Sequence, residues 1–327
     1  MNAALTEVRV PTYARPALLE RALRSLQAQS DPNWRCRVFD DSPDDASLQV
    51  CRRLSDARIL HSFNQPRRFA AGNIDQCFAQ VDDADFAFVL EDDNLVLPTF
   101  IEENIAAVRA HGAPIVLRNQ HVATADLDIE SVEKLPTILE GRFHERVYAP
   151  QEFRVSALFS LGVSNGGLFW SREAETDFEV RAPGCDAVLQ EHLRAALVRD
   201  DVFVARTPLA IWTDNAGDTQ RHSGGGSGFW KRELRLKKAQ IALRRLIASE
   251  LRRDDRYDLV ASTLFNVDLI ERQRDLAKSL LPWPAKAGLS LGERANLAAR
   301  GLAILLLGDT PEDFSQLIRT RLPMEPA

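Results

Sequence analysis

The sequence alternates between short apolar runs typical of strands and longer amphipathic runs typical of helices, and this alternation limits the possible folds. Helical patterns separate the apolar runs, and the first of these helices begins at Pro16. The apolar runs lie near residues 7–11, 35–39, 57–61, 85–90 and 114–117. Strands that alternate with helices over short connections form a mostly parallel sheet with helices on its faces. We therefore predict an α/β fold that binds its ligands at the carboxyl ends of the strands.

Polar residues follow three of these runs directly, at the sheet edge where ligands would bind. They are Pro11 to Tyr13, the pair Asp40 and Asp41, and the acidic run Glu91 to Asn94. In an extended segment, the first and third residues of the acidic run project to the same side and can converge on one hard cation. A solvated turn that caps the next helix is the alternative for the acidic run alone. Two acidic clusters at one edge repel each other unless a cation or ligand compensates, which favours a binding site.

The second half of the chain predicts a different organisation. A helix is expected at about 186–198 and strands near 202–205 and 209–212, followed by a glycine-rich stretch that indicates a flexible hinge. We place a catalytic domain at 1–222, the hinge at 223–229 and a helical region at 230–327. The charge supports this division: residues 1–228 carry 23 basic and 34 acidic side chains, and the remainder 18 and 13.

Several classes of protein are excluded by simple features of the sequence. The four cysteines form no C-x-x-C pair, which argues against a disulfide framework or a zinc site, and each is expected to be a small buried apolar residue. No apolar run approaches the roughly 18 residues that a membrane span needs. These features predict a cytoplasmic protein.

Three motifs in this order resemble glycosyltransferase family 2, whose members have the GT-A fold. The opening strand and helix read V-R-V-P-T-Y-A-R-P-A-L-L-E-R-A-L from Val8. The end of the second strand reads F-D-D-S-P-D-D-A from Phe39. The fourth strand and its acidic run read F-V-L-E-D-D-N-L-V-L-P from Phe88, like the strand that carries the D-x-D motif of the family. The resemblance therefore implies a GT-A sheet followed, in this chain, by a helical C-terminal region.

The resemblance also implies which residues bind a nucleotide-diphospho-sugar donor. Pro11, Thr12 and Tyr13 would line the nucleotide base, with the tyrosine ring stacked on it. Asp40 or Asp41 would accept a hydrogen bond from the edge of the base.

The acidic run would contact the rest of the donor. By the resemblance, Glu91 lies near the ribose and Asp93 binds a divalent metal, Mn²⁺ or Mg²⁺, that bridges the diphosphate. We assign Asp92, between them, and Arg15, which follows the first strand, to the same donor site.

The third helix departs from the pattern of the family. Members often carry an A-R-N triplet where this chain reads A-G-N up to Asn73, which we also assign to the donor site. Arg67 or Arg68 could replace the missing arginine by pairing with phosphate oxygens, and an exposed loop arginine is the alternative.

The resemblance further implies a catalytic base at the head of a helix, roughly a hundred residues after the acidic run. Asp186 and Glu191 are the candidates. At 100° per residue, Asp186 shares a stripe with Leu189, Leu193 and Leu197, whereas Glu191 faces solvent. We favour Asp186, for which a helix N-cap is the alternative role.

Two further segments resemble parts of the family. His222 could complete the metal site or contact the diphosphate, and a loop histidine without such a role is the alternative. Asn165, Gly166 and Gly167 resemble an acceptor-side loop in which a sugar approaches the backbone, and an ordinary turn is the alternative.

The helical region is strongly basic from Lys231 to Arg256. It could lie peripherally on an anionic membrane, at its inner face, where lipid-linked acceptors reside. A solvated helix face or a homodimer contact is the alternative, and the one favoured by the sequence. Aromatic residues are sparse there, so nucleic acid is not an expected partner.

The sequence as a whole predicts an inverting, metal-dependent glycosyltransferase. It would move a hexose from a nucleotide-diphosphate donor, with UDP favoured, to a saccharide or other hydroxyl acceptor. The rival prediction is a catalytically degenerate protein that binds nucleotide sugars or serves in assembly.

Overall fold

The computed structural model describes the chain with gaps, as residues 4–124, 129–159, 161, 163–182, 185–214, 227–253, 257–260, 262–282, 288–310 and 312–321. The first part of the chain forms β1 (Thr6–Thr12), α1 (Pro16–Gln27), β2 (Trp34–Asp40), α2 (Ala46–Leu54), β3 (Ile59–Phe63), α3 (Phe69–Gln76), β4 (Phe86–Val89), β5 (Leu95–Val96), α4 (Phe100–His111) and β6 (Ile115–Thr124). After these come β7 (Arg146–Tyr148), α5 (Pro150–Val155), β8 (Leu168–Ser171), α6 (Ala187–Leu197), β9 (Val202–Asp214), α7 (Ser227–Arg253), α8 (Leu269–Lys278), α9 (Leu291–Leu307) and α10 (Glu312–Arg321).

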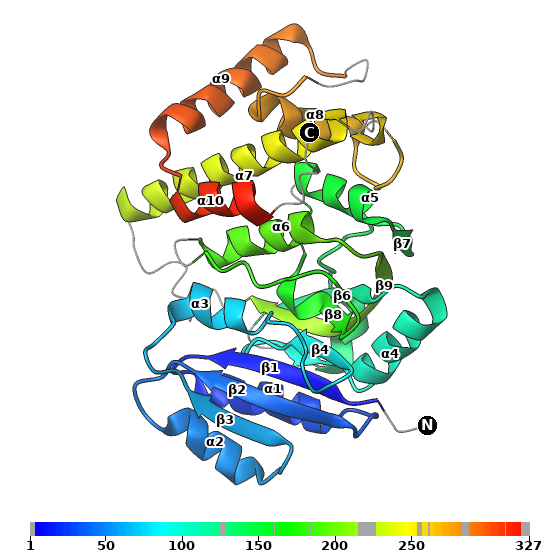
Figure 1. The fold of residues 1–327 in the computed structure, drawn as a ribbon, viewed down its shortest axis with the longest axis vertical. Helices are drawn as coiled ribbons and strands as arrows, with labels where there is room; N and C mark the ends of the chain where they lie inside the picture. The colour runs from blue at the N-terminus through cyan, green and yellow to red at the C-terminus, as the bar shows by residue number, and fades with distance from the viewer. Residues whose placement is uncertain are drawn as a thin grey trace.

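A single mixed sheet lies at the centre of this arrangement, and α6, α7 and the later helices stack in successive layers away from it (Figure 1). The strands run in the order β3-β2-β1-β4-β8-β6-β9-β5, and β7 pairs with β9. The four strands from β3 to β4 are parallel to one another, whereas β8 is antiparallel to both of its neighbours. The predicted α/β sheet with flanking helices and a helical C-terminal region is confirmed.

The local signals in the sequence explain the first strand and helix. All seven residues of β1 are buried because the strand is central and helices cover both faces of the sheet. Proline occupies the first turn of α1, where its missing N–H costs no hydrogen bond. Leu19, Leu23 and Leu26 of α1 are fully buried, as their helical spacing predicts.

The strands predicted at 202–205 and 209–212 are one strand, β9, of 13 residues. It runs parallel to β6 along both of its halves, and a register shift between Arg118 and Gln120 of β6 absorbs the irregularity between them. The break expected from sequence is therefore a bulge in the pairing and does not end the strand.

The outer helices share a core with the sheet. One cluster of buried side chains combines Leu189 and Leu193 of α6 with Leu243 and Ile247 of α7. The predicted hinge lies partly outside the described residues, and its last three positions, 227–229, are the first turn of α7. The domain boundary at residue 222 also lies outside them and stays a prediction.

The expectations for cysteine and for membrane spans can be compared with the described residues. All four cysteines are free and buried, as predicted. Burial raises the pKa of the Cys185 thiol to about 12, so it is chemically inert at neutral pH. Within the described part of the chain, every helix is too short or too polar to cross a bilayer.

Candidate active site

The carboxyl ends of β1, β2 and β4 bring the predicted polar clusters to one edge of the sheet. Thr12 pairs in register with Asp40, and its Oγ1 donates a hydrogen bond to Asp92 Oδ2 at 2.7 Å. The backbone N–H of Asp41 donates to the carbonyl oxygen of Thr12 at 3.0 Å. Thr12 therefore links the two acidic clusters that strand order predicted to be neighbours.

Asp40 and Asp41 are almost fully buried, and protein groups contact both carboxylates. Asp40 lies 2.9 Å from His61 Nε2 and accepts the backbone N–H of Ser42 at 2.8 Å. Desolvation raises the pKa of Asp40, but the hydrogen bonds from His61 and Ser42 outweigh it, so the pKa is lowered. Asp41 Oδ1 accepts from Asn64 Nδ2 at 2.7 Å. The protein thus compensates these charges itself, and the contact to a base edge stays a prediction.

Arg68 and Asn73 reach the same edge from the side of α3. The backbone N–H of Arg68 donates to both carboxylate oxygens of Asp41, at 3.2 and 3.1 Å, while its side chain is exposed. Asn73 Nδ2 donates to the carbonyl oxygens of Thr12 and Phe39, at 3.3 and 3.1 Å. Asn73 is therefore a buried link between β1 and β2, and its contact with the donor stays a prediction.

The residues predicted to line the base differ in exposure. Pro11 is buried within β1, whereas Tyr13 is half-buried. The guanidinium carbon of Arg67 lies 4.4 Å from the centre of the Tyr13 ring and 5.2 Å from that of Phe69. Arg67 thus covers one face of the ring that is predicted to stack on the base.

Arg15 contacts two carboxylates of the acidic run. Its Nη1 donates to Asp93 Oδ2 at 2.7 Å, and its Nη2 lies 3.3 Å from Asp92 Oδ1. Arg21 Nη2 donates to the carbonyl oxygen of Asp93 at 2.7 Å. Desolvation raises the pKa of Asp92 to about 7, against the opposing effect of Arg15. The acidic run therefore holds one deeply buried carboxyl, Asp92, beside the more accessible Asp93, whose side chain is 14% exposed.

Glu91 belongs to a chain of side-chain amides. Its Oε2 accepts from Asn94 Nδ2 at 2.9 Å and its Oε1 from Asn165 Nδ2 at 3.3 Å. Asn94 Oδ1 in turn accepts the backbone N–H of Thr213 on β9 at 3.0 Å. The orientation of Glu91 is thus fixed from β9 and from the short 3₁₀ turn Asn165–Gly167.

Arg194 of α6 extends this chain, and sequence reasoning missed it. The residue is 0% exposed. Its Nη1 donates to Asn165 Oδ1 at 2.8 Å, and its Nη2 to Asp75 Oδ1 at 3.0 Å. Its guanidinium carbon also lies 3.7 Å from the ring centre of Phe78. A single arginine within the apolar part of a helix was the available signal, because such a residue needs a buried partner.

The two candidate bases lie on α6 in different settings. Asp186 is the N-cap, and its Oδ1 accepts the backbone N–H of Val188 at 3.0 Å. Its Oδ2 lies 3.9 Å from Nε of Arg232 on α7, and its side chain is 33% exposed. Oδ1 of Asp186 therefore fills the alternative N-cap role, and Oδ2 faces Arg232. Glu191 is half-buried farther along the helix.

The donor atoms at this edge determine whether the expected metal can bind. In the described part of the chain no three His, Cys, Asp or Glu side chains are grouped to hold a metal ion. Asp93, whose Oδ2 pairs with Arg15, offers one partly exposed carboxylate of the kind that Mg²⁺ and Mn²⁺ prefer. His222 lies outside the described residues. The residues fit a cation held by Asp93 together with oxygens of a bound diphosphate, and do not fit a site made by protein side chains alone.

The glycines of the predicted acceptor-side loop have a packing role. A Cβ on Gly167 would lie 2.3 Å from the carbonyl oxygen of Arg118, and one on Gly166 would lie 3.2 Å from Gln120 Oε1. Gly167 is thus required for close approach to β6. An ordinary turn before β8, the alternative role, therefore explains this glycine without a bound sugar.

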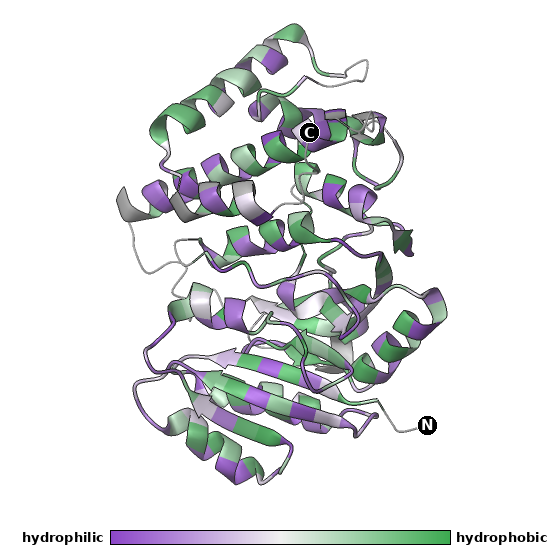
Figure 2. Cartoon of the chain, viewed as in Figure 1, coloured by the Kyte–Doolittle hydropathy of each residue, from purple (hydrophilic) through white to green (hydrophobic). Residues whose placement is uncertain are grey.

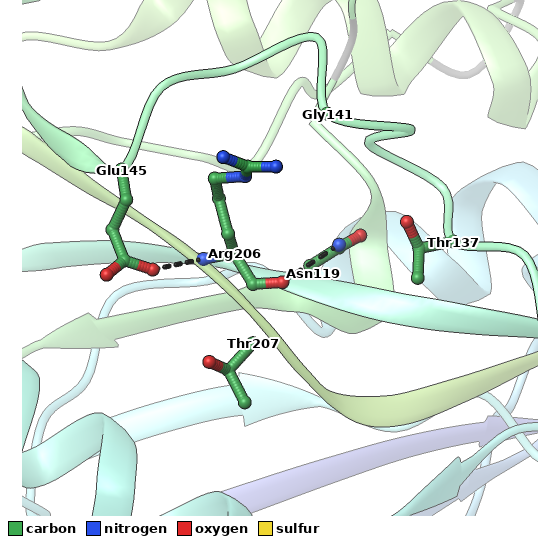
Figure 3. Close-up of a pocket in the computed structure, with 6 residues that line it drawn as sticks. All are labelled: Asn119, Thr137, Gly141, Glu145, Arg206 and Thr207. Atoms are coloured by element: carbon green, nitrogen blue, oxygen red, sulfur yellow. Dashed lines mark hydrogen bonds between the residues drawn. The ribbon is translucent and has the colours of Figure 1, made fainter. Parts of the chain in front are cut away.

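A pocket of about 420 Å³ is lined by other residues (Figure 3). Asn119 Nδ2 donates to the carbonyl oxygen of Arg206 there, and the Arg206 backbone N–H donates to Glu145 Oε2. None of the six residues that line it was predicted for the donor site. The polar sheet edge therefore remains the candidate active site.

The family comparison covers the donor side of this edge. The model described as "Glycosyl transferase family 2" matches residues 7–155. These residues are a family 2 glycosyltransferase domain. The glycosyltransferase domain contains β1 to α5 and all the predicted donor residues, whereas Asp186 and His222 lie beyond the matched range.

Solved structures extend the likeness of fold to the helices that follow the glycosyltransferase domain. TarS from S. aureus matches with 14% identity and a TM-score of 0.53, over 96% of this chain and 55% of that one. This chain thus spans about half the length of that TarS structure. TarS 1–349 in complex with UDP-GlcNAc matches with 14% identity and a TM-score of 0.52, over 96% of this chain and 90% of that one. Among curated protein sequences, no relative matches.

Proposed function

We propose that this glycosyltransferase transfers a hexose from a UDP-sugar to a hydroxyl group of a saccharide or lipid-linked acceptor, with inversion at the anomeric carbon. The observation that carries the proposal is the bond from Thr12 to Asp92, which joins the end of β1 to the acidic run beside Asp40 and Asp41. This edge carries the Tyr13 ring, the carboxylates of Asp41 and Glu91 and the guanidinium of Arg15, side chains of the kinds that can contact a base, a ribose and a diphosphate. The UDP-GlcNAc bound in the TarS 1–349 structure makes that sugar nucleotide the first donor to test.

The proposed donor contacts follow the edge from β2 to β4. Tyr13 stacks on the base, Asp41 accepts from the edge of the base, and Glu91 accepts from a ribose hydroxyl. The amides of Asn94 and Asn165 hold Glu91 in place for this contact. Arg15 fixes the direction of the Asp93 carboxylate.

The transfer step needs a base on the acceptor side. In our proposal Asp186 takes the proton of the acceptor hydroxyl through its second carboxylate oxygen. The acceptor oxygen then forms a bond to the anomeric carbon as the bond from that carbon to the diphosphate oxygen breaks, and UDP leaves. When bound at Asp93, a divalent cation supplies positive charge that stabilises the leaving diphosphate.

The donor is tested first by its effect on thermal stability. A ligand that binds the native state alone raises the melting temperature, so a panel of UDP- and GDP-sugars with and without Mn²⁺ or Mg²⁺ identifies the nucleotide and the need for metal. We expect the largest rise with a UDP-sugar and metal together. An unchanged melting temperature with every nucleotide sugar would contradict the proposal.

Turnover tests the chemistry. Asp93→Asn should lower kcat/KM for donor consumption by about 10²–10³-fold, because an amide is a weaker ligand than a carboxylate for the cation proposed to stabilise the leaving diphosphate. The matched control is Asp82→Asn, an exposed residue outside the site, which should keep full activity. Full activity in the Asp93 variant would overturn the mechanism. Donor binding without turnover on any acceptor would instead favour the degenerate binding protein.

The choice of base is tested separately. Asp186→Asn should lower kcat by about 10²–10⁴-fold with little change in KM for the donor, since a general base acts on the acceptor. Glu191→Gln, the matched control on the same helix, should keep most of its activity. The reverse result would assign the base to Glu191.

A further inference from the structure

The outer helix α9 exposes an apolar stripe along its whole length. Its members share one side of the helix, with spacings of four, four, three and four residues, and all five are exposed: Leu291, Ala295, Ala299, Leu302 and Leu306. The side chain of Leu306 is 75% exposed, and that of its neighbour Leu307 is 71% exposed. Figure 2 shows α9 as largely hydrophobic near its C-terminal end, where Leu306 and Leu307 lie. Contiguous exposed leucines on a soluble protein mark a surface that a partner covers.

The adjoining helix α7 carries a basic stripe. Lys231, Lys238, Arg245 and Arg252 recur at intervals of seven residues, which keeps them on one side of a helix. From residue 227 to residue 249, Glu233 is the one acidic residue among seven basic ones. This stretch of α7 therefore bears a strong positive charge along its exposed side.

The two stripes meet where α9 ends. The Nζ of Lys238 donates to the carbonyl oxygen of Gly308, the residue after α9. A Cβ on Gly308 would lie 2.8 Å from the carbonyl oxygen of Leu234, so the end of α9 rests directly on α7 (Figure 1). Trp230, in the first turn of α7, is 64% exposed. Leucines, a tryptophan and basic side chains thus belong to neighbouring turns of two packed helices.

We propose that α9 and α7 form a docking surface for an anionic lipid bilayer. Leucine and tryptophan side chains enter the interface between headgroups and acyl chains, and lysine and arginine side chains pair with anionic headgroups beside them. A second copy of the chain is the less suitable occupant. In a twofold contact through α9, the basic stripes of both copies would approach the same interface, where like charges repel.

The position of α7 connects this surface to the candidate active site. Arg232, next to Lys231 of the basic stripe, places its Nε 3.9 Å from Asp186 Oδ2. A bilayer docked on this surface would therefore lie against the same helix that contacts the candidate base. The docking itself requires no sugar transfer, so its test is independent of the proposed function.

The experiment is sedimentation of the full chain with lipid vesicles. One set consists of phosphatidylcholine, and the other of phosphatidylcholine with phosphatidylglycerol. We expect binding to the anionic vesicles, weakened by added salt, and little binding to the neutral ones. Equal binding to both sets, or to neither, would overturn the proposal.

Paired variants separate the two stripes. Leu302→Asn with Leu306→Asn, and Lys231→Glu with Arg245→Glu, should each weaken the partition onto anionic vesicles by about tenfold or more. Leu60→Asn is the control for the leucines because Leu60 is 52% exposed on β3. Arg37→Glu with Arg109→Glu, exposed residues of β2 and α4, is the control for charge. Losses as large in the controls would contradict the assignment of this surface.

Light scattering tests the competing occupant. We expect a mass that is independent of protein concentration and unaffected by Leu302→Asn with Leu306→Asn. A concentration-dependent dimer that this pair of substitutions abolishes would assign the stripe to a second copy and overturn the proposal.

Discussion

The sheet edge buries polar side chains, whereas the outer helix α9 exposes apolar ones. At the sheet edge, the carboxyls of Asp40 and Asp92 are buried, and each accepts hydrogen bonds from within the protein. On α9, by contrast, Leu302 and Leu306 lie at the surface. Burying polar groups with partners holds a site in one geometry before a ligand arrives. Exposing apolar groups leaves contact energy for a partner, so the preorganised candidate site differs in kind from the proposed docking surface.

The largest effect is expected for the buried ion pair of Arg194 and Asp75, which lies next to Asn165 of the candidate site. Arg194→Met should lower the free energy of unfolding by about 3–5 kcal/mol, because Asp75 would stay buried without its cationic partner. Urea unfolding measures the difference. The matched control is Arg181→Met: the Arg181 side chain is 54% exposed and pairs with Asp177 at the surface. We expect a loss of at most about 1 kcal/mol there, and equal losses would show that the buried pair contributes no more than the surface pair.

A smaller effect on the free energy of unfolding is expected from the titration of a histidine on α6. Burial, with the nearby Arg244, lowers the pKa of His192 on α6 to about 4, from 6.5. Between these values the unfolded chain binds a proton that the native protein does not. The contribution of His192 is therefore complete above pH 6.5 and is lost as the pH falls towards 4, by up to about 3 kcal/mol.

His192→Asn removes this titration. Chemical unfolding at several pH values should show a shallower decline for the variant than for the unaltered protein across that window. Parallel curves would mean that His192 titrates as in the unfolded chain.

The smallest effect is expected on the exposed stripe. Leu302→Ala should lower the free energy of unfolding by less than about 1 kcal/mol, since about half of the residue is already exposed to water. The same substitution at the fully buried Leu193 of α6 should cost about 2–5 kcal/mol. A large loss at Leu302 would mean that the leucine stabilises the fold and is not reserved for docking.

The sheet edge could be predicted because its signals are local. Apolar runs end at polar residues, and parallel strands bring those ends together, so the neighbourhood of Thr12, Asp40 and Asp92 follows from order along the chain. The stripe of Leu189, Leu193 and Leu197 on α6 was likewise predicted from its period and is buried.

The partners within the site could not be predicted. Arg194 and Asp75 are 119 residues apart, and no periodicity connects them. Helical angles placed Asp186 on the buried stripe, but at a helix start the side chain turns to cap the first N–H groups instead. Composition alone does not show which face of α9 is exposed. The exposed face depends on how the helix packs against α7 and α8.

Gly301 of α9 sets the angle at which that face is presented. A Cβ at this position would lie 1.9 Å from the carbonyl oxygen of Lys278 at the end of α8, so the two helices touch through their backbones. A single added methyl group would push α9 away from α8 and tilt it. In evolutionary terms, one substitution at this position could change the inclination of the proposed docking surface without altering its charge or its leucines.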